Sequence, residues 1–424
     1  MSSDGGNTWG LRCQLPGQAY GSWGDLSVRF SAAGNWLLFS YLSVNSTLEF
    51  HLRGTTTMFL PYFAGNLLPP GFGSTSEFDQ PRLGARPWSA EFAVAVSDQG
   101  FSTGCSWGMF LWAKAVSFPP SLAKACVAHR PATERPRAQQ VAIHRTGVAY
   151  VAFLEITGED GPDLIGNVVL VRGTPSTLAS LSDLVEPPGP GGCDHPDGAV
   201  GVRVRRCLRL PWGPAGSADF GWEVRRGALA IAVHPEIRQR VYLAYGDVKS
   251  NSSSLQTLHL LRSDDGGMHW SSLGLAKGNA TNPGLAVDGQ GRLGFLYQRF
   301  ANGRWTHQLD VWSDANQLLK EIPLANTGVP KAAPPGGPPF QGDYLDLLAT
   351  GNEFLGVFSA WNDPQTAVFP FGVKYQRLCE NAGLRSLWLP KLGSQVNPSV
   401  DPFFFRVEMD QSSNPALWEA RMAC

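Results

Sequence analysis

The sequence predicts an all-β protein, a six-bladed β-propeller of four-stranded antiparallel blades. Glycine (48 residues) and proline (32 residues) are abundant among the 424 residues, whereas charged residues make up only 16%. This composition suits many short strands joined by tight turns. One hairpin pattern also recurs six times along the chain. Four strands repeated at a spacing of about 40 to 60 residues are typical of a β-propeller.

Each repeat has a polar start, an apolar alternating strand, a turn with glycine or polar residues, and a second apolar strand. Alternation of apolar and polar residues favours a half-buried strand, so each repeat predicts a β-hairpin. The starts lie roughly 55 to 60 residues apart, with one interval of about 90. The six hairpins are predicted at 24–42, 79–98, 137–156, 227–247, 282–300 and 342–363.

The residues after each hairpin predict a weaker third and fourth strand, as in "LQTLHLLRSDDGGMHWSSLGL" at 255–275. Seven blades are the alternative count. We expect one domain, 1–424, because the repeats run the length of the chain. Four stretches, several of them rich in glycine and proline, predict inserted loops within it, at about 60–78, 117–136, 185–222 and 329–340.

One turn motif, Ser-x-Asp-x-Gly-x-x-Trp, occurs twice. The aspartate can accept hydrogen bonds from its own turn, the glycine permits a left-handed backbone, and the tryptophan can pack on the hairpin. These needs are structural, so we expect no catalysis from the motif. Its residues are Ser263, Asp265, Gly267 and Trp270 in one copy and Ser2, Asp4, Gly6 and Trp9 in the other.

The first copy of the motif stands at the start of the chain, at the point that lies between strands three and four in the fourth repeat. Residues 9–15 therefore predict an outer strand whose partners come from the C-terminal end, either 371–379 or 403–409. Pairing of N- and C-terminal strands in one blade would close the ring.

Seven cysteines occur without metal-ligand spacing, and we expect disulfides and a secreted or extracytoplasmic protein. Cys105 with Cys126, and Cys193 with Cys207, are close enough in sequence to staple loops. A bridge from Cys13 to Cys379, or alternatively to Cys424, would lock the closure.

Several classes of partner are not expected. The net charge is −1 and the only basic cluster, 203–209, is interpreted as a solvated loop, so we expect no nucleic acid. The apolar runs are too short to span a bilayer. We expect no metal and no cofactor, and the sequence sets no oligomeric state.

The turn motif resembles the Asp-box of the sialidase superfamily. In that family the Asp-boxes lie on the side of the propeller away from the active site, which implies a functional side where first strands start and second strands end. The candidates on that side are Asp25, Asp79, Gln139, Gln140, Asn282, Asp343 and Tyr344 at strand starts, and Glu155, Tyr245, Asp247, Arg299, Trp361 and Asp363 at strand ends.

The resemblance implies a nucleophile at Tyr344, beside Asp343. A carboxylate must take the phenol proton, and Glu155, Glu223 and Asp247 are candidates. Asp79 or Asp25 would be the general acid. We assign ligand binding to Asp25, Asn282, Asp247, Arg299 and Trp361, since carboxylates and aromatic faces suit a sugar.

The three arginines with which the family holds sialic acid are missing from their expected positions, although Arg29, Arg82 and Arg299 could form a substitute. We therefore predict a glycoside hydrolase that acts on a glycan other than sialic acid, with a glycan or polysaccharide as partner. Two alternatives stay open. One is a non-catalytic carbohydrate- or protein-binding propeller, and the other is a polysaccharide lyase, with His129, His144 or His234 as its base.

Overall fold

The structure is a computed structural model, and it contains only β-strands in the residues that it describes. These residues are 22–30, 37–44, 48–55, 78–98, 107–114, 121–126, 135–161, 163–174, 181–191, 193, 195–211, 213–214, 224–225, 228–248, 256–329, 345–361, 369–373, 387–388, 395–396, 400–410 and 415–419. All pairs of neighbouring strands are antiparallel. The predicted all-β class is confirmed.

The six predicted hairpins are present as the first two strands of six successive sheets. Gly147 and Gly291 stand in two of the turns with φ of 92° and 80°, a left-handed conformation that glycine adopts without steric cost. The hairpins are β1 (Ser22–Phe30) with β2 (Leu37–Val44), β4 (Phe78–Ala85) with β5 (Glu91–Asp98), β8 (Arg135–Ile143) with β9 (Ala149–Asp160), β14 (Leu229–Val233) with β15 (Val241–Asp247), β18 (Ala280–Val287) with β19 (Leu293–Ala301), and β22 (Asp346–Thr350) with β23 (Glu353–Trp361).

Further strands complete the sheets. The first sheet has three described strands and the other five have four. The added strands are β3 (Leu48–Thr55), β6 (Trp107–Lys114) and β7 (Ser121–Cys126), β10 (Asp163–Gly173) and β11 (Val202–Pro211), β16 (Thr257–Ser263) and β17 (Ser271–Lys277), β20 (Arg304–Trp312) and β21 (Leu318–Gly328), and β26 (Val400–Glu408) and β27 (Ala416–Glu419). Two small ribbons pair β12 (Gly213–Pro214) with β13 (Val224–Arg225) and β24 (Leu387–Trp388) with β25 (Gln395–Val396).

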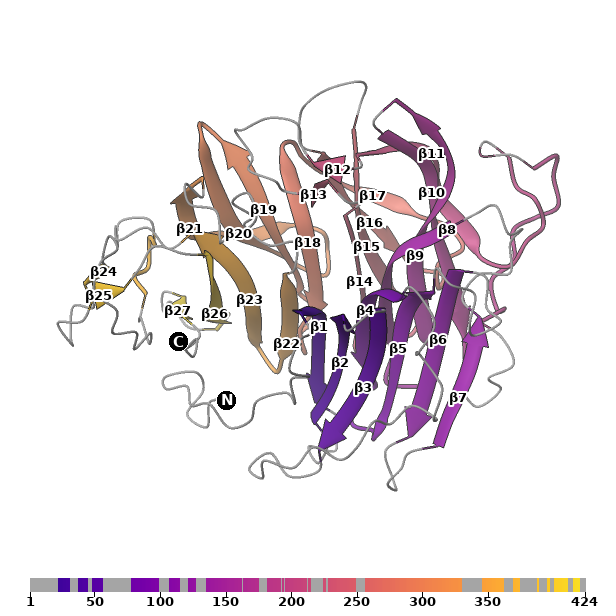
Figure 1. Cartoon of the computed structure of the whole chain (residues 1–424), viewed down its shortest axis with the longest axis horizontal. Helices are drawn as coiled ribbons and strands as arrows, with labels where there is room; N and C mark the ends of the chain where they lie inside the picture. The colour runs from indigo at the N-terminus through magenta and orange to yellow at the C-terminus, as the bar shows by residue number, and fades with distance from the viewer. Residues whose placement is uncertain are drawn as a thin grey trace.

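The first strands of successive sheets contact one another in chain order, from β1 through β4, β8, β14 and β18 to β22. Several of them gather near the middle of Figure 1, with β7 and β21 toward its edge. The first and last sheets also meet, because Arg29 of β1 makes a two-pronged ion pair with Asp346 of β22, with Nη2 donating to Oδ1 at 3.0 Å. Antiparallel sheets in this arrangement are consistent with a β-propeller.

Apolar side chains fill the seams between neighbouring sheets. Alternate residues of a strand point to opposite faces, so Val151 and Phe153 of β9 pack toward the second sheet, while Leu154 packs toward the fourth. The seam between the fifth and sixth sheets is rich in phenylalanine, including Phe354 and Phe403. Burying each such side chain stabilises the fold by about 1.5–3 kcal/mol, and both faces of these sheets are thereby fixed.

Four of the six first strands carry a β-bulge at an equivalent place. In β1, β4, β8 and β18 the first strand advances three residues while its partner advances two. Beside two of these bulges a polar side chain bonds to the backbone of the neighbouring sheet: Ser27 Oγ accepts from the Leu83 amide at 3.1 Å, and Gln139 Nε2 donates to the Val96 carbonyl at 3.1 Å. Bulges re-aim side chains and are common at functional rims.

Two predicted loops contain strands. The prediction that 185–222 is an insertion is wrong for 202–211, which form β11, the outer strand of the third sheet. The basic cluster 203–209 is thus part of a strand, not a solvated loop. Arginines alternate with apolar residues there, and the flanking glycines and prolines obscure this alternation. Likewise, 117–136 contains β7 and the start of β8.

The sixth sheet corrects the predicted closure. Its order is β22-β23-β26-β27, and β26 includes most of the predicted partner 403–409. The outer position that we predicted for residues 9–15 is taken by β27, because the chain reverses after β26 and Leu417 packs into the core. Residues 9–15 and most of 371–379 lie outside the described residues.

Candidate functional site

The strand directions define two rims of the molecule. At one, which we name the strand-start rim, the first strands begin and the second strands end. At the other, the turn rim, lie the turns within the six hairpins and the turn that contains Asp265, because Val241 pairs with Ser263. Asp25 and Asp79 are backbone positions near the starts of β1 and β4, on the strand-start rim. Asp343, Tyr344, Glu223 and Asp363 lie outside the described residues.

Four side chains meet at the strand-start rim between the third and fourth sheets, and we name them the rim cluster: Arg205 of β11, Tyr245 and Asp247 of β15, and His259 of β16. Tyr245 pairs directly with His259 across the strands, and Asp247 is two residues further along the same face. The Tyr245 and His259 rings stack at 4.9 Å between centroids. Strand register therefore brings three of the four groups together.

Hydrogen bonds connect the rim cluster. His259 Nε2 and Asp247 Oδ1 are 2.8 Å apart, and the Arg205 Nε–H donates to the Tyr245 hydroxyl oxygen at 3.3 Å. The side chains of Asp247 and His259 are 22% and 24% exposed, so both are partly open to solvent. Tyr245 is buried, and burial raises the pKa of its phenol, against the effect of the neighbouring Arg205.

The extension of the third sheet holds Arg205 in place. The third sheet continues past Glu155 to the end of β9 at Asp160, and there Arg209 forms an ion pair with Asp160. The amide of Val248, just after β15, donates to the Arg209 carbonyl at 3.0 Å. β11 thus lies against the end of β15 and supplies an arginine to the fourth sheet.

These groups have the properties of an acid–base site. An imidazole transfers protons near neutral pH, and a carboxylate bonded to one ring nitrogen orients the ring. A guanidinium offers several donors to a carboxylate or hydroxyl. The rim cluster can accordingly remove a proton, donate one, and hold an anionic group.

Glu155, a predicted proton acceptor, is in a different environment. Its side chain is 1% exposed, and Oε2 accepts hydrogen bonds from Asn167 Nδ2 at 2.7 Å and Arg203 Nε at 2.9 Å. Arg203 also pairs with Glu186 and Asp197. Burial alone lowers the pKa of Arg203, but these carboxylates raise it overall, so its charge is retained. In the buried Glu155–Arg203 pair, Glu155 also accepts from Asn167 and Arg203 also pairs with Glu186 and Asp197.

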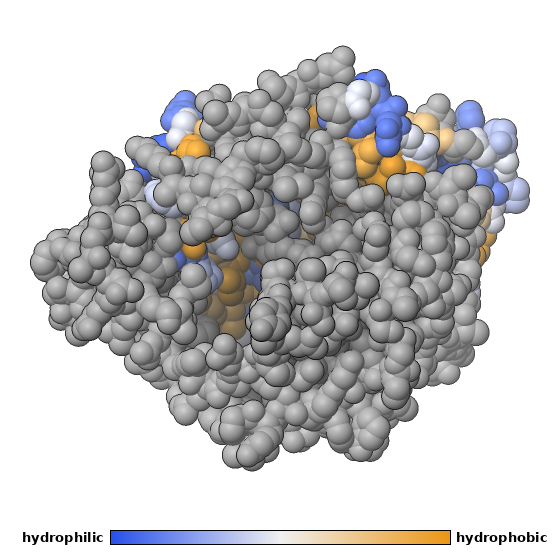
Figure 2. Space-filling view, viewed as in Figure 1, coloured by the Kyte–Doolittle hydropathy of each residue, from blue (hydrophilic) through white to orange (hydrophobic). Residues whose placement is uncertain are grey.

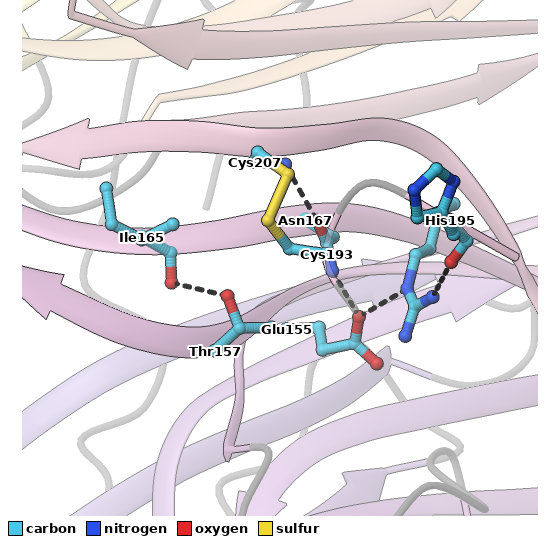
Figure 3. The surroundings of a disulfide bond; sticks show 8 residues. Glu155, Thr157, Ile165, Asn167, Cys193, His195 and Cys207 are labelled. Carbon is cyan, nitrogen blue, oxygen red and sulfur yellow. Dashed lines mark hydrogen bonds and ion pairs between the residues drawn. A yellow bond between two sulfur atoms is a disulfide. The ribbon is translucent and has the colours of Figure 1, made fainter. Parts of the chain in front are cut away.

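The predicted Cys193–Cys207 disulfide is confirmed, with 5.3 Å between the Cα atoms. Cys207 has a φ of 50°, and its amide donates to Asn167 Oδ1 at 2.9 Å. Figure 3 shows this series of contacts from Cys207 through Asn167 to Glu155. Glu155 therefore helps to fasten the loop before β11 to the third sheet. Cys13, Cys105 and Cys379, and the Cys126 side chain, lie outside the described residues.

The remaining predicted ligand-binding residues differ in accessibility. Asn282, half-buried at a φ of 50°, donates through Nδ2 to Gln298 Oε1 at 2.7 Å. Arg299 is exposed at the end of β19, while Trp361 is buried at the end of β23. His144 and His234, proposed as lyase bases, lie in buried positions at the turn rim, where desolvation is the largest cause that lowers their pKa values.

At the turn rim, the Asp265 turn has the interactions expected from its sequence. Asp265 Oδ1 accepts from the amides of Met268 and His269 at 3.0 Å, and the Trp270 indole donates to the Gly267 carbonyl at 3.0 Å. Burial tends to raise the pKa of Asp265, but bonds from His269 and Ser263 lower it to about 2. The hydrogen bonds that the Asp265 carboxylate accepts all come from residues 263–269 of its own turn.

Sequence reasoning missed His259 and Arg205. The position of His259 opposite Tyr245 was detectable, since a third strand antiparallel to 241–247 places residue 259 near the strand-start rim. Arg205 could not be found in this way, because its segment was interpreted as a loop. No group of three His, Cys, Asp or Glu side chains within the described residues is arranged to hold a metal ion. In the same residues no helix is long and apolar enough to cross a bilayer.

Figure 2 draws one face of the molecule in a space-filling view. Figure 2 shows a recess left of the centre of that face, and described apolar residues are visible at its floor.

No protein-family model and no curated protein matches this chain. Among solved structures, it is similar to an alpha-L-arabinanase of Penicillium chrysogenum in complex with arabinobiose, at 12% identity and a TM-score of 0.45, over 78% of this chain and 87% of that one. A protein of unknown function from Dyadobacter fermentans is similar at 9% identity and a TM-score of 0.43, over 81% and 94%. An alpha-L-arabinofuranosidase of Lactobacillus brevis is similar at 11% identity and a TM-score of 0.35, over 69% and 92%.

Proposed function

We propose that this chain is an extracytoplasmic carbohydrate-active enzyme that cleaves a glycan other than sialic acid at its strand-start rim. The observation that carries the proposal is the rim cluster, where a partly exposed His259–Asp247 pair lies beside Tyr245 and Arg205. A site for binding alone needs no oriented imidazole, whereas acid–base catalysis does. The Cys193–Cys207 disulfide supports an oxidising compartment.

Two of the described arginines argue against sialic acid. Arg29, one of the three that could replace the family's arginine cluster, is engaged with Asp346, and Arg203 is engaged with three carboxylates. The sialidase family holds the sialic acid carboxylate with three arginines together, and neither Arg29 nor Arg203 is available for such a cluster.

Hydrolysis of a glycosidic bond is the reaction that the sequence predicts first. It needs two carboxyl groups that flank the scissile bond. Asp247 is the proposed first carboxyl group. Asp79, and Asp343 with Tyr344 as nucleophile, remain the proposed partners for it.

We further propose that the six sheets are the blades of one closed six-bladed propeller, a single domain that spans 1–424. The contacts between successive first strands support this count, and the Arg29–Asp346 pair supports closure between the first and sixth sheets. Seven blades remain the alternative.

The test is a screen with nitrophenyl glycosides, arabinan, galactan and uronate polysaccharides. It compares wild type with Asp247→Asn, with Tyr344→Phe, and with the matched control Asp264→Asn, whose carboxylate pairs with Arg240 and Arg262 at the turn rim. We expect turnover to fall about 100-fold or more in Asp247→Asn and to persist in the control. Glycan binding without turnover, unchanged by Asp247→Asn, would instead support a binding protein.

A further inference from the structure

We infer that the substrate is a uronate-bearing polysaccharide and that the rim cluster breaks it by β-elimination. The inference rests on the proposed function and extends it to a substrate class and a reaction. It follows from a comparison of the arginines of β11. Most of them are paired with carboxylates, and one is available to a ligand.

Arg205 differs from the other arginines of its strand. Arg203, Arg206 and Arg209 of β11 all form ion pairs with carboxylates. Among the residues that the structure describes, Arg205 forms no ion pair with a carboxylate, and it donates instead to the neutral Tyr245 hydroxyl and to the Val204 carbonyl. It is nevertheless partly buried at the rim.

A partly buried guanidinium without a carboxylate partner suits an anionic ligand. Burial strengthens the attraction to an incoming carboxylate, and the planar guanidinium can bind it with two parallel hydrogen bonds. Two of its five N–H groups donate to Tyr245 and Val204, and the others can reach a ligand. A uronate carries its carboxylate on C5, a ring carbon that also bears a hydrogen, whereas the ring carbon that carries the carboxylate of sialic acid bears none.

The neighbours of Arg205 supply the acid and the base. His259 is oriented by Asp247 and is partly exposed, so it can remove a proton from carbon. The Tyr245 oxygen accepts a hydrogen bond from Arg205, which leaves its own proton available for donation. Burial raises the pKa of this phenol, which keeps it protonated until it acts as the acid.

The reaction balances without an oxidant and without water. Arg205 binds the uronate carboxylate, which makes the adjacent C5–H bond more acidic. His259 takes the C5 proton, the electron pair forms a C4=C5 double bond, and the C4–O4 bond breaks. The leaving O4 takes the proton of Tyr245. His259, which is partly exposed, then releases its proton to solvent, and Tyr245 regains one from solvent, so no proton is gained or lost overall.

The experiment uses the full chain with polygalacturonate, alginate, glucuronan and chondroitin, each with its methyl ester. Two products are measured: the ultraviolet absorbance of the new conjugated double bond, and the reducing ends. We expect both to appear together with at least one free-acid polymer, and more slowly with its ester. Reducing ends without the double bond would overturn the elimination and leave the proposed function intact. No cleavage of any polymer or neutral glycan would overturn both.

Three variants test the roles. In Arg205→Gln, activity on the free-acid polymer should fall about 10- to 100-fold, and it should fall less on the ester, which offers no anionic group to Arg205, so the preference for the acid form is lost. Arg206→Gln, which loses a pair with Glu186, is the matched control and should keep the preference for the acid form. The Tyr245→Phe variant should cleave the polymer more slowly than wild type. It should still cleave a uronate with a nitrophenyl group on O4, since nitrophenolate leaves without a proton from an acid. Circular dichroism and Tm establish that each variant is folded. A preserved acid preference in folded Arg205→Gln would overturn the role of Arg205.

Discussion

Two histidine–aspartate pairs involve the same strand, β16, and its flanking segments, and they face opposite rims. His259 contacts Asp247 at 2.8 Å and His269 contacts Asp265 at 2.6 Å. The difference lies in what else the aspartate binds. Asp265 also accepts from two backbone amides and the Ser263 hydroxyl, so its oxygens are used by the turn. Asp247 contacts the His259 ring, and the pair adjoins Arg205 and Tyr245. The same two side chains therefore stabilise a turn at one rim and form a candidate site at the other.

The largest expected effect is on turnover, which should depend on His259 and not on His269. We expect His259→Gln to reduce turnover by about 10²- to 10⁴-fold, because it removes the proton carrier of the rim cluster. His269→Gln, whose side chain is 88% exposed, should leave turnover within a factor of about two. Steady-state rates on the polymer cleaved by wild type measure both, and equal losses in the two variants would erase the distinction.

A second prediction concerns the buried carboxylate of the same rim. Arg203→Met leaves Glu155 and Glu186 buried without their cationic partner, so we expect a loss of about 3–5 kcal/mol in the free energy of unfolding. Urea denaturation measures it. The control Arg206→Met removes a more exposed pair and should cost about 1 kcal/mol or less. Similar small losses in both would mean that the Glu155 network does not stabilise the third sheet.

The third prediction concerns His307, a histidine of β20 in the fifth sheet. It is fully buried, stacks on Phe358, and lies 2.9 Å from the Ser359 carbonyl. Burial lowers its pKa from 6.5 to about 3. The unfolded chain thus binds a proton that the folded chain does not between these values, and stability falls as the pH is lowered through this window, by up to about 1.4 kcal/mol per pH unit.

Urea midpoints measured between pH 7 and pH 4 test this slope. His307→Gln should have a flatter dependence than wild type. A variant with the parent's slope would assign the pH dependence to other groups.

The smallest expected effect lies in the turn. Asp265→Ala should lower the free energy of unfolding by about 1 kcal/mol, as for loss of a side chain that caps backbone amides. Because the pKa of Asp265 is lowered to about 2, its contribution is present above pH 3.8 and is lost as the pH falls through 2. Turnover at neutral pH should be retained, as measured with the polymer that wild type cleaves. A large loss of turnover would move the functional site to the turn rim.

The fold was largely predictable from the sequence, and the site only in part. The six hairpins were found because alternation and turn residues are local properties of the chain. β11 was missed because prolines and glycines flank a strand whose alternate residues are arginines. Asp247 was predicted from the end of its strand, but its contact with His259 depends on register and Arg205 depends on packing between sheets. Glu155 was correctly placed at the end of a second strand. Its burial depends on Arg203 of β11, so the sequence did not reveal its environment.

The most direct test of the rim cluster is a titration of the imidazole resonances of His259 and His269 by NMR, with the oligosaccharide that wild type cleaves. The Tyr245→Phe variant is used, because its slower turnover preserves the oligosaccharide during the measurement. We predict that the His259 resonances move in a saturable way while those of His269 stay in place. Movement of His269 alone, or of neither histidine while the sugar binds, would contradict it.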